Sequence, residues 1–130
     1  MDAHAYAYGG SIIQDMGYYP FGSKLFTDLL HYVRSGDFVL NLIRDSQDLN
    51  GYAFSLGALS HYTADNNGHR MATNVAVPLL YPKVRLQFGN QVTYADDALS
   101  HGKMELAFDV LQIAQGHYDP TVTTRSSDFR

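Results

Sequence analysis

Two stretches of this chain place a histidine four residues before an acid. His61 is followed at this spacing by Asp65 and then by His69, and His101 is followed by Glu105. Residues four apart lie above one another on an α-helix, so the spacing presents nitrogen and oxygen donors on one helix face. Imidazole and carboxylate together suit zinc. The pattern therefore predicts helices that carry a metal site.

The rest of the sequence predicts an all-α fold. The 130 residues are 45 % apolar, which is enough for one domain with a buried core. No segment shows a convincing strand pattern, and helical spacing recurs along the chain. We expect one multi-helix bundle over residues 1–120, with the metal site between helices, and a flexible tail over 121–130.

Charge and cysteine content narrow the classes of function. The formal net charge is −4, which provides no basic field for gripping duplex nucleic acid. Cysteine is absent, so any metal must be held by His, Asp, Glu or backbone groups. We expect no duplex nucleic-acid partner. Oligomeric state stays open.

No segment approaches the roughly 18 apolar residues of a membrane-spanning helix. The start, Met1-Asp2-Ala3-His4, lacks the basic and apolar regions of a signal peptide. We therefore expect peripheral contact with a membrane at most, and the compartment stays open.

Local signals divide the chain into five helical segments. Ser23 is a suitable N-cap for a helix over 24–33, and Asp37 for the next one. In the helix over 51–65, small residues at Gly57 and Ala58 leave room beside His61 for an ion or a second helix. The other expected segments are a helix within 3–15, an irregular connection over about 77–93 marked by Pro78 and Pro82, and a last helix from Asp96-Asp97 to Gln115, ended by Gly116.

Four of these segments resemble a known family. Gly10–Pro20, Phe26–Val33, Leu59–His69 and the pair His101 and Glu105 match, in order and type, an Asp, a His, a His-Asp-His element and a His-Glu pair. The chain thereby resembles the zinc-dependent phospholipase C family, including its phospholipase C/D domain group, and the related single-strand-specific zinc nucleases. These are all-helical phosphodiesterases with metals in a cleft between helices.

The resemblance implies a ligand set. Asp15, His31, His61 and Asp65 would hold one zinc, His69, His101 and Glu105 would hold a second, and Asp65 would bridge to a third. Three residues separate Asp65 from His69, as in the phospholipase C/D variant. The third ion of secreted members is held by a helix that should precede residue 1, so we expect either an N-terminally incomplete domain or a two-metal site. Asp28, one turn before His31, is expected to orient that imidazole.

The resemblance also implies an activity. We expect a zinc-dependent phosphodiester hydrolase, by family default on glycerophospholipids, in which two or three zinc ions activate water and Asp15 or Asp65 accepts a proton. A 3′-nucleotidase or single-strand nuclease is the close alternative. A metal-stabilised domain without catalysis is another, and a metal-free bundle with a surface partner is a third.

Overall fold

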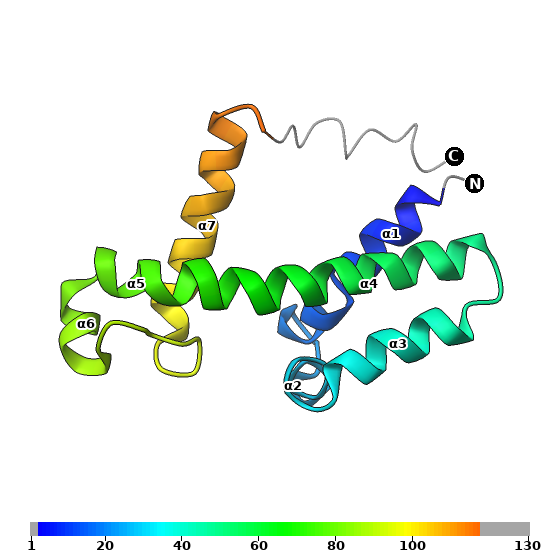
Figure 1. The fold of residues 1–130 in the computed structure, drawn as a ribbon, viewed down its shortest axis with the longest axis horizontal. Coiled ribbons are helices and arrows are strands. Elements are labelled where there is room, and N and C mark those ends of the chain that lie inside the picture. The colour runs from blue at the N-terminus through cyan, green and yellow to red at the C-terminus, as the bar shows by residue number, and fades with distance from the viewer. Residues whose placement is uncertain (1–2, 118–130) are drawn as a thin grey trace. The chain divides into compact units, whose positions relative to one another are not determined.

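The computed structural model describes residues 3–117, and every regular element in that range is helical (Figure 1). The all-α prediction is confirmed. In chain order the elements are α1 (His4–Ser11), the 3₁₀ helix η1 (Ile13–Tyr18), α2 (Lys24–Tyr32), α3 (Ser35–Asp45), α4 (Leu49–Gly68), the π-helix η2 (His69–Thr73), α5 (Asn74–Leu80), α6 (Pro82–Phe88) and α7 (Ala98–Ala114). The expected tail over 121–130 lies outside the described residues.

The chain divides into two units, and the division falls within α4. The first unit includes the residues up to Ala64, and the second begins at Asp65. Each unit has its own small apolar core: Val39 and Ala58 are buried in the first, and Val77 and Val92 in the second. Each unit also holds one of the residue groups described below.

In the first unit, glycines bring α1 and α4 into backbone contact. A Cβ atom at Gly10 would collide with the carbonyl oxygen of Phe54, and one at Gly57 would collide with the carbonyl oxygen of Ala7. Gln14, which is buried at the start of η1, donates from Nε2 to the carbonyl oxygen of Ala58 at 2.9 Å. The space expected beside the small residues of α4 is therefore filled by a second helix.

Two of three local expectations in the first unit need correction. The helix expected within 3–15 ends at Ser11, and η1 follows as a separate 3₁₀ turn. Ser23 does cap α2, accepting a hydrogen bond from the Phe26 amide at 3.3 Å. Asp37 does not cap α3, because Arg34 precedes that helix in a left-handed conformation and the Asp37 carboxylate pairs with its guanidinium.

The irregular connection expected over 77–93 is wrong, because α5 and α6 occupy most of it. Pro82 stands in the first turn of α6, where its fixed φ suits a helix start. Pro78 lies inside α5 and has no N–H to donate to the carbonyl oxygen of Asn74 four residues earlier. The Val92 amide donates to that oxygen instead, at 2.9 Å. The carbonyl oxygen that Pro78 leaves without a helical donor thus connects α5 to the loop that contains Val92.

The last helix begins and ends as predicted. Asp97 caps α7 by accepting from the Ser100 amide at 3.1 Å, and Gly116 terminates it with a φ of 72°. Hydrogen bonds from Ser100 to Asp97, and from Thr93 to Asp96, lower the pKa of both carboxyl groups. Both acids therefore stay ionised near the start of α7, where negative charge favours the helix. None of the helices in the described range is long and apolar enough to cross a bilayer.

Candidate metal centre

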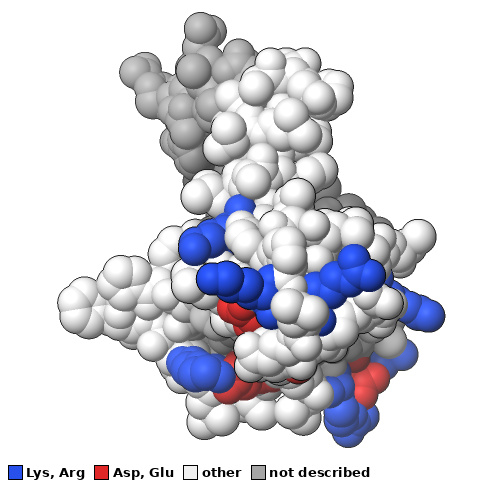
Figure 2. Space-filling view, turned by 90° about the vertical axis from the view of Figure 1, so that its left-hand side faces the viewer, with Lys and Arg blue, Asp and Glu red and all other residues white. Residues whose placement is uncertain are grey.

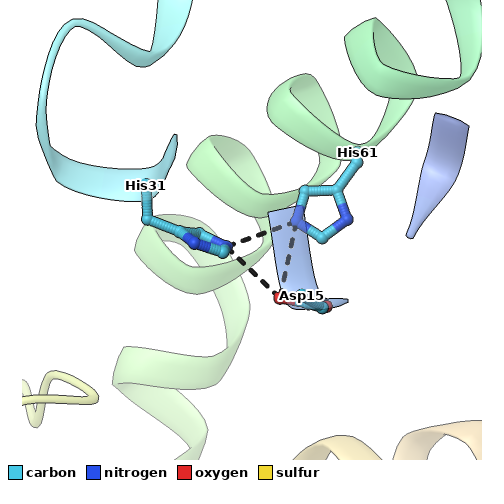
Figure 3. Close-up of side chains that lie close together, drawn as sticks. All are labelled: Asp15, His31 and His61. Atoms are coloured by element: carbon cyan, nitrogen blue, oxygen red, sulfur yellow. Dashed lines mark hydrogen bonds and ion pairs between the residues drawn. The ribbon is translucent and has the colours of Figure 1, made fainter. Parts of the chain in front are cut away.

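The first unit brings Asp15, His31 and His61 together from three elements (Figure 3). Asp15 comes from η1, His31 from α2 and His61 from α4. Asp15 Oδ1 lies 3.3 Å from His31 Nε2 and 3.9 Å from His61 Nε2, and the two Nε2 atoms are 3.4 Å apart. We call these three residues the first group.

Backbone carbonyls orient both imidazoles of this group. His31 Nδ1 lies 2.9 Å from the carbonyl oxygen of Thr27, and His61 Nδ1 lies 2.9 Å from that of Ser11. A carbonyl oxygen only accepts, so each Nδ1 carries the proton, and each Nε2 of a neutral ring presents a lone pair. Asp28 does not play the orienting role expected of it, because its carboxylate pairs with Lys24.

The geometry of the first group fits zinc. Donor atoms about 2.0 to 2.1 Å from a tetrahedral ion stand roughly 3.3 to 3.4 Å from one another. Two of the three separations match this value, and the third is within 0.6 Å of it. The imidazoles are largely buried, with side-chain exposures of 9 % and 14 %, whereas Asp15 is 44 % exposed. The carboxylate side is therefore open to water and to a ligand.

The second unit brings His69, His101 and Glu105 together, which we call the second group. Glu105 Oε1 lies 3.4 Å from His69 Nε2 and 4.0 Å from His101 Nδ1, and the two imidazoles stack with centroids 5.4 Å apart. His69 belongs to η2, and the other two residues lie one turn apart on α7. The predicted pairing of His101 with Glu105 on one helix face is confirmed.

The surroundings of His101 fit a metal ligand. It is completely buried, and its Nε2 donates to the carbonyl oxygen of Val92 at 2.5 Å. Its Nδ1 is buried and has no hydrogen-bond partner. An orphaned polar atom in the interior is costly, and a metal ion next to it removes that cost. Val92 also donates to Asn74, so its backbone holds the ring in place from α5.

Asp65 lies beside the second group. Its Oδ1 is 3.0 Å from His69 Nε2, and both side chains are about one-third exposed. The carboxylate is therefore positioned either to bind an ion held by His69 or to accept a hydrogen bond from that ring. Its predicted place on the first zinc and its bridging role stay predictions.

Sequence reasoning missed the groups that orient the ligands. The carbonyls of Thr27, Ser11 and Val92 leave no signal in side-chain type, because every residue has a carbonyl. Only the first has a sequence clue, since Thr27 stands one turn before His31. His117 contacts Gln112 and lies in neither group.

The comparison with family models decides the family. The model described as zinc dependent phospholipase C matches residues 1–129. The chain belongs to the zinc-dependent phospholipase C family. The resemblance stated from its motifs is therefore confirmed over almost the whole chain. Neither the curated proteins nor the solved structures contain a match to it.

Proposed function

We propose that this chain is a zinc-dependent phosphodiester hydrolase that acts on glycerophospholipids. Membership of the family supports this class of activity. The observation that carries the proposal is the first group, because it combines two Nε2 lone pairs and a carboxylate at zinc-like separations with one open side. The donor set has no thiolate, which suits an ion that must keep a position for a reactant.

The two groups divide the proposed zinc ligands. His31, His61 and Asp15 hold one ion, and His69, His101 and Glu105 hold another, with Asp65 as a further ligand. When bound, zinc supplies a Lewis acid that lowers the pKa of water to about 7 and neutralises charge on phosphoryl oxygens. Elemental analysis distinguishes two bound ions from three.

The chain's own residues orient and accept protons. The Thr27 and Ser11 carbonyls hold the first-group rings so that both Nε2 atoms face one point. Asp15 is the carboxylate of that group and is 44 % exposed, and Asp65 is a one-third exposed carboxylate beside the second group. These two are the proposed proton acceptors. A carboxylate in this position accepts the proton of a water that attacks phosphorus, and the leaving alcohol then takes up a proton.

Zinc binding provides the direct test. We expect metal-free protein to bind at least two zinc ions per chain and to unfold at higher temperature when zinc is added. At free zinc about 100 times the dissociation constant, one site adds about 2.7 kcal/mol to the free energy of unfolding. Elemental analysis and thermal melting of untagged protein measure both effects. Failure to bind zinc would contradict the proposal.

Hydrolysis is then measured on the zinc-loaded chain with phosphatidylcholine and with a 3′-nucleotide. We expect release of the phosphorylated headgroup from the lipid. If only the nucleotide is hydrolysed, the substrate is a nucleotide or nucleic acid and the proposed lipid substrate is wrong. Zinc-dependent melting without turnover of either compound would leave a metal-stabilised domain and overturn the proposed catalysis.

A further inference from the structure

The second unit contains a long segment without acids. Residues 66–95 carry Arg70, Lys83 and Arg85 and no Asp or Glu, whereas the other 100 residues carry six cations and all 13 acids. This segment therefore has a charge of +3 in a chain whose net charge is −4. It forms η2, α5 and α6 and the loop after them. Figure 2 faces the side on which Figure 1 shows α5 and α6, and it shows several Lys and Arg side chains there with a few Asp and Glu side chains between them.

The same segment exposes large apolar side chains. Met71 is 76 % exposed, Leu79 67 %, Leu80 64 % and Leu86 89 %. Lys83 and Leu86 are three residues apart on α6, so they share a side of that helix. Apolar side chains next to cations, without acids, are typical of helices that lie in the headgroup region of a membrane.

Charge separates this surface from the other exposed apolar residues. The exposed Leu99, Leu106 and Val110 of α7 share their helix with Glu105 and Asp109, and they follow Asp96 and Asp97. In the first unit, Lys24 is paired with Asp28 and Arg34 with Asp37. Among the described residues, only the 66–95 segment combines exposed apolar side chains with several cations and no acid.

We propose that η2, α5 and α6 form a docking surface for anionic phospholipid bilayers. The apolar side chains enter the headgroup boundary, and Arg70, Lys83 and Arg85 face lipid phosphates. Because η2 carries both Arg70 and the zinc-ligand candidate His69, docking brings headgroups to the element that carries one member of the second group. The inference rests on the proposed lipid substrate and adds the surface by which the chain reaches it.

Vesicle sedimentation tests the docking surface. We expect the full chain to bind phosphatidylcholine vesicles that contain phosphatidylglycerol more tightly than pure phosphatidylcholine vesicles, and the binding to weaken with salt. Each cation near an anionic surface contributes about fivefold to partitioning, so R70Q/K83Q should lower it by about 20-fold or more. Arg44→Gln on α3 is the charge control and should change it little.

The exposed leucines of the docking surface are tested with a double variant and a control variant. L79S/L86S should weaken vesicle binding by at least about 10-fold, because burial of each leucine is worth more than this loss. Leu106→Ser on α7 starts from a similar exposure of 65 % and should bind as the unchanged protein does. Equal binding to both kinds of vesicle, or equal losses in segment and control variants, would overturn the docking surface.

A soluble substrate separates docking from catalysis. The docking variants should hydrolyse a monomeric short-chain phosphatidylcholine at the normal rate and lose activity only on anionic vesicles. Conversely, Asp15→Asn should keep vesicle binding. If the unchanged chain binds anionic vesicles but hydrolyses no lipid, the docking surface stands and the proposed catalysis fails. If it hydrolyses the monomer but shows no preference for anionic vesicles, the docking surface fails alone.

Discussion

Replacement of His61 by Ala is expected to remove one zinc ion per chain and to lower hydrolysis by more than about 100-fold. Loss of a residue that only supports a ligand already costs about 10- to 100-fold in metal affinity or activity, and loss of a ligand should cost more. His61 provides one of the two Nε2 atoms that face Asp15 Oδ1. Without it, only the donors of Asp15 and His31 remain in the first group. Elemental analysis and initial rates on phosphatidylcholine measure the two losses.

Two further variants distinguish loss of the zinc ligand from a general loss of folding. His61 also bonds the Ser11 carbonyl, so its removal loosens α1 as well as the metal group. Asp15→Asn keeps the size of a half-exposed side chain but removes its charge, and it should also lower zinc content and activity. His117→Ala removes an imidazole from outside both groups and should leave both unchanged. Normal activity of folded His61→Ala protein would refute the first group as the reaction site.

Replacement of Gly10 by Ala is expected to destabilise the first unit strongly. The added methyl group would overlap the Phe54 carbonyl oxygen, which is backbone and cannot turn aside. Overpacking typically costs 1 to 3 kcal/mol, and we expect a loss of about 3 kcal/mol, although alanine favours a helix by about 1 kcal/mol over glycine. Denaturant unfolding of zinc-free protein measures this loss.

The neighbouring glycine provides the control. Gly9 lies on α1 next to Gly10. A Cβ atom at Gly9 would lie 3.8 Å from the Phe54 ring, which is an ordinary van der Waals contact. Gly9→Ala should therefore be neutral or stabilise the protein slightly. Equal effects of the two substitutions would show that α1 and α4 do not depend on their close contact. Because His61 and Ser11 lie on these two helices, Gly10→Ala should also weaken zinc binding.

Helix positions near strong local signals could be predicted. Ser23, Asp97 and Gly116 mark helix ends through hydrogen bonds with residues one turn away or through their own φ, so the sequence contains the whole interaction. The predicted Asp37 cap was wrong because the Asp37 carboxylate pairs with Arg34, whose backbone is left-handed. Pro78 misled because Val92, 14 residues later, supplies the donor that the proline lacks. The Asp37 contact is local but depends on the left-handed backbone of Arg34, and the Pro78 case depends on a residue outside the local pattern.

The exposed apolar residues of α2 show a similar limit. Helical spacing of Phe26, Leu29, Leu30 and Val33 predicts an apolar stripe. Three of these side chains are 39 to 55 % exposed, Leu30 is half-buried, and Thr27 is the buried residue of this helix. Periodicity identifies which residues share a side of a helix, but what covers that side depends on the neighbouring elements. For this reason the core was less predictable than the helices.

The sequence alone determined the all-α class, the family and the two histidine–acid pairs, because each is a matter of residue type and spacing within one helix. Only the tertiary structure decided which donors meet. Asp15, His31 and His61 lie on separate elements, and they converge because Gly10, Gly57 and Gln14 hold the backbone of α1 and η1 against α4. Such convergence depends on backbone contacts between residues more than 40 positions apart, which spacing along the chain does not encode.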